Sequence, residues 1–286
     1  MSGLFQTRFA SLSSRWHQNV RPLTRRLHSV RAGTSSARPH RLASPLLLGA
    51  VTALSAAVIL NSTVHLDAEP KSKLEEVTEE DVVVDPATSI AFPKTLRIPS
   101  KAPLPTFSLV GVGVRTVSFL GIKVYSIGFY ADLSNPNIRV SSSASPEEKI
   151  DAIIRNSACV MRIVPTRSTS YGHLRDGFMR ALQARLLLTK QREPLTPDEE
   201  LLAQSALRKF KTAFPNTPLA KHEPLEILVT APPEDPKQAR PLIIRDMGSV
   251  QNDWLAREFL LAYFEGNGIS PPLKQSVSEN LKDFGN

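Results

Sequence analysis

The sequence predicts an α+β fold with a largely antiparallel sheet, formed by residues 106–286 of a 286-residue chain. Segments rich in Val, Ile, Phe and Tyr occur in mixed order with segments that carry helix-start signals, and the connections between them are short. A hydrophobic content of 41% is enough for a buried core. The single Cys excludes a disulfide framework and any zinc site built from several cysteines.

Five strands are predicted, at residues 107–118, 122–131, 158–166, 224–230 and 241–246. The first two flank Gly121 and are expected to pair as a β-hairpin. Cys159 lies in the apolar third strand, where a core position is expected. The generic catalytic and cofactor motifs are missing, since GVGVRT at residues 111–116 lacks the third glycine of a dinucleotide-binding turn and lies in a strand.

Helices are predicted from Ser145 and over residues 170–190, 196–213, 252–265 and 271–284. Ser145-Pro146-Glu147-Glu148 combines a capping hydroxyl, a proline at the first helical position and acids in the first turn. Thr196-Pro197-Asp198-Glu199 repeats that signal. The mixed order of strands and helices therefore favours one α+β domain.

Residues 1–41 contain the whole basic excess behind the net charge of +8, because they hold eight Arg and no Lys, Asp or Glu. Apolar residues recur every three or four positions from Phe5 to Leu27 and predict an amphipathic helix that Pro22 interrupts. This composition is typical of a mitochondrial transit peptide read by the import machinery. The alternative is a basic tail that binds nucleic acid or an anionic membrane. We expect no nucleic-acid partner, because the remaining chain is electrically balanced.

Residues 42–66 carry no charge and are predicted to form a single transmembrane helix that precedes the domain. A helix of that length reaches about 37 Å, and a bilayer core is ~30 Å thick. Arginines before the segment and acids after it predict an inner-membrane anchor with the C-terminal domain in the intermembrane space. The alternatives are the hydrophobic half of a cleaved sorting signal or a buried helix. Residues 67–105, acidic and then rich in proline, are predicted to be a mostly disordered linker.

Arg115 is the main candidate for a functional residue. Strand alternation places it on the same face as Gly111 and Gly113, which are expected to leave room for a ligand. A guanidinium on a partly apolar face needs an anionic partner, although a snorkelling side chain or a structural salt bridge is the alternative. Tyr171 is a candidate to offer its phenol to the same cavity. His173 is a weak candidate for a metal or haem ligand.

Three sequence blocks resemble the chalcone isomerase family. They are GVGVRTVSFLGIKVYSIGFYAD at residues 111–132, Ile163-Val164-Pro165 followed by Tyr171, and Gly268-Ile269-Ser270-Pro271. With its N-terminal segments and RSTSYGHLRDGF at residues 167–178, the chain resembles the fungal mitochondrial "altered inheritance of mitochondria" branch. The resemblance implies a chalcone isomerase-like open-faced β-sandwich, in which a large antiparallel sheet carries a helical layer and a ligand cleft lies between them.

The resemblance also implies site residues. The plant enzymes are intramolecular lyases that use an Arg, a Thr, a Tyr and an Asn, and these positions are Arg115, Tyr125, Tyr171 and Phe178 here. Two polar groups are thus replaced by aromatic residues, which leaves open whether the protein is an enzyme with Arg115 and Tyr171 as catalytic residues. The resemblance favours a non-catalytic binder of an amphipathic anion such as haem, with these four residues lining the cleft. The alternatives are chalcone isomerase-type ring closure and fatty-acid binding.

Overall fold

The computed structural model describes residues 81–100, 103–117 and 120–285, all within one compact unit that begins at Glu69. The predicted transit peptide, residues 1–41, and the predicted membrane anchor, residues 42–66, lie outside the described residues. In the part of the chain that the structure does describe, no helix has the length and apolar character needed to cross a bilayer.

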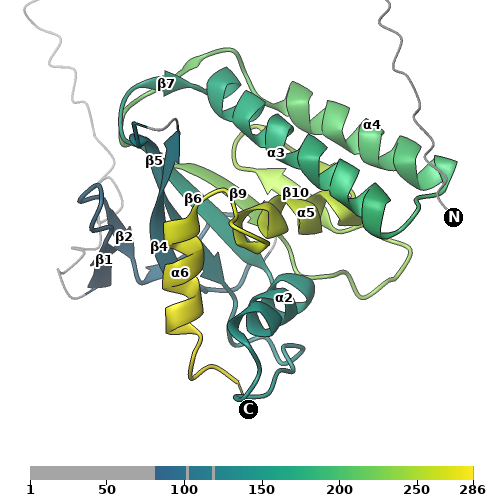
Figure 1. Ribbon diagram of the computed structural model, residues 1–286, viewed down its shortest axis with the longest axis horizontal. Coiled ribbons are helices and arrows are strands. Elements are labelled where there is room, and N and C mark those ends of the chain that lie inside the picture. Colours follow the sequence, from purple (N-terminus) through teal and green to yellow (C-terminus); the bar gives the residue numbers. More distant parts are fainter. Residues whose placement is uncertain (1–80, 101–102, 118–119, 286) are drawn as a thin grey trace, which may run out of the picture. The chain divides into compact units, whose positions relative to one another are not determined.

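An antiparallel sheet of seven strands forms the centre of the described unit, in the order β11-β10-β9-β6-β5-β4-β3 (Figure 1). Its strands are β3 (Thr95–Leu96), β4 (Phe107–Val117), β5 (Ile122–Ala131), β6 (Cys159–Pro165), β9 (Leu225–Val229), β10 (Pro241–Ile244) and β11 (Gly248–Gln251). The predicted β4–β5 hairpin and the antiparallel sheet are confirmed. The sequence did not predict the short strands β3 and β11, because two to four residues carry too little periodicity.

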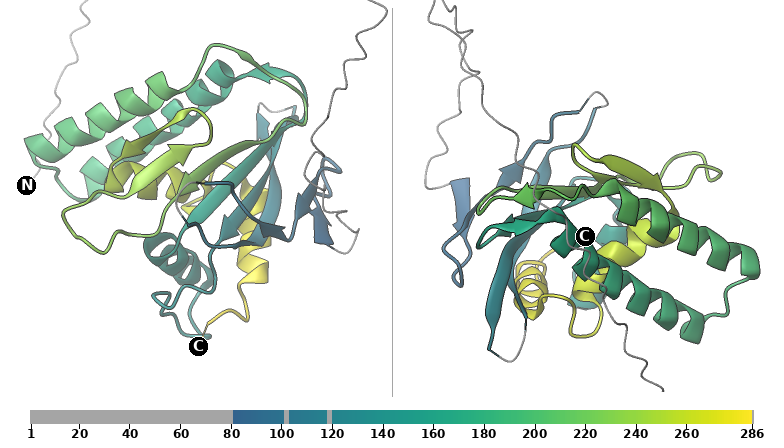
Figure 2. Two further views of the ribbon diagram at one scale, coloured as in Figure 1. Left: turned by 180° about the vertical axis from the view of Figure 1, so that it is seen from behind. Right: turned by 90° about the horizontal axis from the view of Figure 1, so that it is seen from above.

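Helices form a layer on one face of this sheet (Figures 1 and 2). They are α2 (Pro146–Asn156), α3 (Tyr171–Arg192), α4 (Pro197–Ala213), α5 (Asp253–Phe264) and α6 (Pro271–Asn280). Ser145 and Thr196 form capping boxes with Glu148 and Glu199, so both predicted start signals are confirmed. A short ribbon of β7 (Thr169–Ser170) and β8 (Pro218–Leu219) leads into α3. The main core lies between sheet and helices and includes Cys159, which is fully buried as predicted.

The opposite face of the sheet is covered by residues that the sequence predicted to be a disordered linker. There β1 (Val82–Val84) pairs with β2 (Ala91–Pro93), and Phe92 is fully buried against the sheet. The Tyr130 hydroxyl donates to the Pro93 carbonyl at 2.9 Å, and Ser126 donates to the buried Asp85 carboxylate at 2.6 Å. The linker prediction is therefore wrong for residues 82–96. The prediction failed because it treated the segment as uniform, although its first half is acidic and its second half is apolar, with prolines that are compatible with short strands.

The glycines of β4 make room for a helix and not for a ligand. A Cβ at Gly113 would lie 2.3 Å from the backbone nitrogen of Leu273, and one at Gly111 would lie 2.7 Å from Cγ2 of Val277. Both partners belong to α6, which crosses β4 at this point. The expectation that these glycines open a ligand space is therefore wrong, because close helix–strand packing already uses that space.

Candidate functional site

Arg115 lies near the end of β4, directly opposite Tyr125 of β5, and shares with it the face that is covered by helices. Its side chain is half-buried, and Nη1 donates to the carbonyl oxygen of Ile269 at 2.5 Å. Arg115 forms no ion pair with any residue that the structure describes. A guanidinium has five N–H donors, so most of its hydrogen-bonding capacity remains for a ligand.

The loop between α5 and α6 presents the carbonyl that Arg115 binds. Gly268 has φ 63°, and a Cβ there would lie 2.0 Å from the Tyr263 carbonyl oxygen, so only glycine fits. Ser270 caps α6 by accepting from the Leu273 N–H, while its hydroxyl donates to the Val114 carbonyl at 2.8 Å. The Gly-Ile-Ser-Pro block is therefore a backbone device that ties α6 to β4 and directs Ile269 toward Arg115.

A small cavity of about 50 Å³ lies beside Arg115, between the β4–β5 hairpin and the first turns of α3. Its apolar walls come from Val117, Val124, Leu174, Phe178 and Ile269. Its polar lining consists of Arg115, Tyr125, His173 and Arg180, and Gly177 completes it. No Asp or Glu lines this cavity, so its electrostatic potential favours an anion.

Tyr125 forms a buried phenol pair with Tyr263 of α5, with their hydroxyl oxygens 3.0 Å apart. Burial raises the pKa of Tyr125, although the hydrogen bond from Tyr263 and the charge of Arg115 act in the opposite direction. Burial also raises the pKa of Tyr263 well above its usual value. Both phenols are therefore neutral at physiological pH. When Tyr263 donates to Tyr125, the Tyr125 proton is left for an acceptor in the cavity.

Phe178 is chiefly a core residue. Its ring lies 5.5 Å from that of Phe259, 6.0 Å from that of Phe214 and 6.4 Å from that of Phe210. These aromatic contacts join α3, α4 and α5, and one edge of Phe178 reaches the cavity wall. The space beneath α3 is thus filled by protein side chains.

Tyr171 does not line this cavity. Its pKa is raised by partial burial and by the negative charges of Glu223 and Asp246, and Arg115 has no part in that shift. His173 lies on the rim as an exposed residue of α3. Within the described ranges there is no group of three or more His, Cys, Asp or Glu side chains suited to a metal ion.

Of the residues singled out from the sequence, the structure brings together Arg115, Tyr125 and Phe178, with His173 at the edge. Sequence reasoning missed Tyr263 and Arg180. A signal for Tyr263 existed, because a buried tyrosine in an apolar helix needs a hydrogen-bond partner. Nothing local in the sequence distinguishes Arg180 from other surface arginines.

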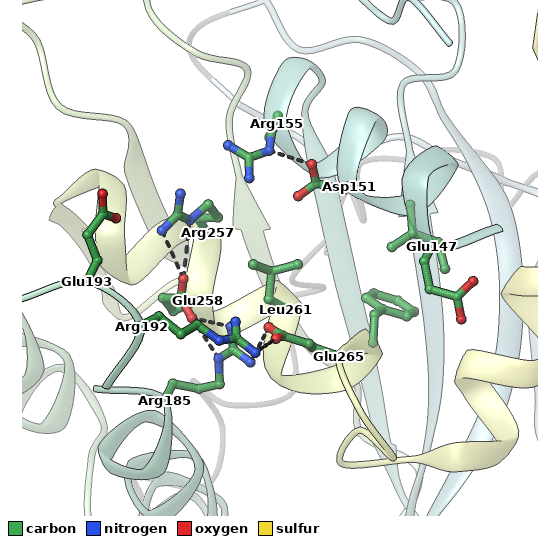
Figure 3. A pocket seen from close by; sticks show the side chains of 12 residues that line it. Glu147, Asp151, Arg155, Arg185, Arg192, Glu193, Arg257, Glu258, Leu261 and Glu265 are labelled. Atoms are coloured by element: carbon green, nitrogen blue, oxygen red, sulfur yellow. Dashed lines mark hydrogen bonds and ion pairs between the residues drawn. The ribbon is translucent and has the colours of Figure 1, made fainter. Parts of the chain in front are cut away.

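A larger groove of about 370 Å³ lies between α2, α3 and α5 (Figure 3). Arg185 reaches Glu258 and Glu265, each at 2.5 Å, while Arg192 also pairs with Glu265. Arg257 pairs with Glu258 at 3.1 Å. Each arginine that lines the groove pairs with an acid, Arg155 doing so with Asp151, so the network joins α3 to α5 and leaves no arginine unpaired for an anionic ligand.

The fold and the site together define a class: a curled antiparallel sheet with helices on one face and an arginine directed into a small cavity between the two layers. The chain belongs to the chalcone isomerase-like family, whose sequence model matches residues 105–143 and 134–278. The predicted family membership is thereby confirmed.

Relatives of known name support the same family. The protein "Altered inheritance of mitochondria protein 18, mitochondrial" of Debaryomyces hansenii is 27% identical over 90% of this chain and 93% of its own. The Lachancea thermotolerans protein of that name is 25% identical over 57% of this chain and 62% of its own. An uncharacterized protein of Schizosaccharomyces pombe is 34% identical, but the match covers 37% of this chain and 44% of that protein.

Among solved structures, the crystal structure of an Arabidopsis thaliana fatty-acid binding protein is similar to this chain with a TM-score of 0.49. The two are 22% identical in sequence, and the match covers 70% of this chain and 97% of that one.

Proposed function

We propose that this protein is a non-catalytic mitochondrial binding protein that holds the carboxylate of an amphipathic ligand on Arg115. The observation that carries the proposal is a half-buried guanidinium without an ion pair among the described residues, in a cavity that no acid lines. A charged group in such surroundings is stabilised by an anionic partner. A mitochondrial location is supported by the names of the relatives and by the composition of residues 1–41.

Cavity size decides which ligand class is favoured. The volume of about 50 Å³ accommodates a carboxylate, whereas pockets that enclose whole drug-sized ligands measure roughly 300–1,000 Å³. The apolar part of the ligand must therefore pass out of the mouth beside Val117, or α3 must move away from β5. A flexible fatty-acid chain meets either requirement more easily than a rigid, planar molecule.

Haem fits these residues poorly. The cavity lacks the volume for a tetrapyrrole, and His173, the single imidazole on its rim, is exposed on the surface of α3. An iron ligand at that position would leave most of the haem outside the cavity. We therefore favour a fatty acid over haem as the ligand whose carboxylate binds Arg115.

The site also argues against ring closure of a chalcone. The Tyr125–Tyr263 pair and Phe178 are buried beside Arg115, and the cavity of about 50 Å³ that remains is too small to enclose a chalcone. Tyr171, which the resemblance assigns to catalysis, lies outside the cavity that Arg115 lines. Such catalysis depends on holding the substrate between an arginine and a tyrosine. In this geometry Arg115 and Tyr171 do not face a common cavity, so they cannot position a substrate together.

We also propose that residues 42–66 hold the protein in the inner membrane, with the folded domain in the intermembrane space. The uncharged segment and the charges that flank it support this topology. Carbonate extraction of mitochondria should leave the protein in the membrane, and protease should cleave the domain only after the outer membrane is ruptured. Release into the carbonate supernatant would contradict anchoring.

The ligand assignment is tested with residues 69–286, the compact unit that retains β1 to β3. We expect oleate to displace a fluorescent fatty acid and methyl oleate, which lacks the carboxylate charge, to displace it much more weakly. Arg115→Ala should weaken oleate binding about 10- to 100-fold, the range for a hydrogen bond to a charged group. Arg208→Ala, an exposed arginine on α4 outside the cavity, is the matched control.

Because Arg115 also binds the Ile269 carbonyl, a second variant separates ligand binding from folding. A Cβ at Gly177 would meet nothing closer than Nη2 of Arg180 at 3.9 Å, so Gly177→Ala narrows the cavity without a clash. This variant should bind oleate more weakly while remaining folded. Equal affinity of both variants and the wild type would refute the proposal. Haem added to the same fragment should give the spectrum of free haem, and an Arg115-dependent Soret band would reverse the order of the two ligands.

A further inference from the structure

The β4–β5 hairpin ends in exposed aliphatic side chains. Val117 and Ile122 face each other across the hairpin and are 41% and 37% exposed, and Leu120 between them is 70% exposed. Aliphatic side chains this exposed bury only part of their apolar surface and so gain less from folding than core residues do. The hairpin end projects from the sheet on the same side as β7 and the start of α3 (Figure 1).

Basic residues flank this hairpin on both faces of the sheet. On the helix side lies the Arg115 cavity, with Arg180 and His173 on its lining. On the other side a groove of about 280 Å³ is lined by Lys123, Lys221 and His222, together with the Thr166 hydroxyl and the turn at residues 87–90. No Asp or Glu lines either hollow.

The nearest acids along the chain are Asp176, Glu223 and Asp85, of which Asp85 is buried and accepts from Ser126. Asp176 pairs with Arg175 at 2.9 Å, and Glu223 accepts from the Ala220 N–H at 3.1 Å. The Lys123 ammonium donates to the Ala87 carbonyl at 2.5 Å, which fixes its position, and it forms no ion pair with any residue that the structure describes. This end of the domain therefore combines an aliphatic tip with basic residues on both sides of it, which outnumber the nearby acids Glu223 and Asp246.

We propose that this hairpin end docks the folded domain on the surface of an anionic bilayer. In the docked state Val117, Leu120 and Ile122 enter the interface while the flanking bases contact lipid phosphates. This pairing of aliphatic insertion with basic flanks is the chemistry of reversible interfacial binding. Charge complementarity selects a lipid surface, since each basic residue near an anionic membrane contributes attraction without requiring a matched partner geometry.

Docking in this orientation places the mouth of the Arg115 cavity against the bilayer, because Val117 belongs both to the hairpin tip and to the cavity wall. An amphipathic anion could then move between the membrane and Arg115 without crossing water. Docking itself rests on the exposed tip and the basic flanks, and it does not require the ligand assignment to be correct.

The test uses residues 69–286, because residues 1–68 contain apolar and basic segments that would bind membranes themselves. The fragment is sedimented with vesicles of phosphatidylcholine alone and of phosphatidylcholine with about 30% phosphatidylserine. We expect binding to the anionic vesicles only, and binding should weaken as salt is added. No sedimentation with the anionic vesicles, or equal binding to both kinds, would overturn the proposal and leave a protein partner for this surface.

Two pairs of variants locate the contact. Ile122→Asp should abolish binding, while Leu202→Asp, at a leucine of α4 that is even more exposed, should not. Lys123→Gln combined with Lys221→Gln should lower the partition coefficient about five-fold for each lysine, corresponding to ~1 kcal/mol per basic residue. Lys209→Gln combined with Lys237→Gln removes the same charge from exposed positions elsewhere. Equal losses in both lysine pairs would show an effect of net charge alone and refute the assigned surface.

Thermal melting of each variant shows whether it is folded. Membrane docking and ligand binding fail separately in these assays. Gly177→Ala should weaken oleate binding and leave vesicle binding unchanged, whereas Ile122→Asp should remove vesicle binding and leave oleate binding in solution intact.

Discussion

Replacing Gly113 by alanine tests whether the glycines of β4 are needed for close packing against α6 or leave space for a ligand. In most strands this substitution is favourable, because glycine in a strand interior costs about 0.5–1 kcal/mol relative to alanine. Here the new Cβ would lie 2.3 Å from the backbone nitrogen of Leu273 and 2.6 Å from its Cα. Both contacts are to backbone, so no side-chain rotation relieves them.

The cost follows from what must move. Ordinary van der Waals contact begins near 3.4 Å, so α6 has to retreat by about 1 Å. That shift loosens Leu273 and Val277, both fully buried, and lengthens the Ser270–Val114 hydrogen bond. Overpacking of this kind costs typically 1–3 kcal/mol, and we expect about 3 kcal/mol for Gly113→Ala because backbone meets backbone.

For a domain of this size, such a loss lowers the melting temperature by roughly 6–12 °C. The assay is thermal and urea unfolding of residues 69–286. Gly177→Ala is the control, because its Cβ on α3 makes only an ordinary van der Waals contact with Arg180 and should stabilise the protein by about 0.5–1 kcal/mol. A Gly113→Ala protein with an unchanged or raised melting temperature would refute the packing argument and restore the ligand space that the sequence suggested.

Three further outcomes are expected. Tyr125→Phe should lower the free energy of unfolding by about 1–3 kcal/mol, because it leaves the buried Tyr263 hydroxyl without its partner. The double variant Tyr125→Phe/Tyr263→Phe should lose less stability than the sum of the two single variants, and additive losses in this double-mutant cycle would contradict the pairing. Burial raises the pKa of Cys159 to about 12, so the thiol of the native protein should resist alkylation near pH 8, and rapid labelling would disprove this. The stability of the protein should fall as pH rises from 9 toward 12, because in that range the Cys159 thiol ionises only in the unfolded chain. A fragment of residues 106–286 should melt at a lower temperature than one of residues 69–286 and bind a hydrophobic dye, because it loses Phe92 from the sheet; equal melting would show that β1 to β3 contribute nothing.

Much of the fold was predictable because its signals are local. The helix starts at Ser145 and Thr196 depend on a hydroxyl, a proline and a glutamate within four residues, and the structure confirms both capping boxes. The β4–β5 hairpin follows from β-branched and aromatic residues around one glycine. The strands at residues 82–96 escaped prediction because they are stable only through contacts with a sheet formed later in the chain.

In the candidate site, too, some features could be predicted from local sequence and others depend on contacts between distant residues. Arg115 could be singled out from the sequence because a charge in an apolar strand is unusual, and the resemblance assigned Tyr125 and Phe178 to the same cleft. That Tyr125 is held by Tyr263, and that Tyr171 lies outside the cavity, depends on residues distant in the chain. No spacing within one strand or helix reports such contacts.

The sequence alone determined the family, the α+β class and the antiparallel hairpin, and it singled out Arg115 as a candidate, because each of these is encoded in consecutive residues. Only the tertiary structure decided what surrounds Arg115. It placed α6 over the glycines, brought the Ile269 carbonyl to the guanidinium and filled the cleft with aromatic rings until about 50 Å³ remained. The physical reason is that cavity volume is the small difference between closely packed elements, and it is set by how distant segments meet.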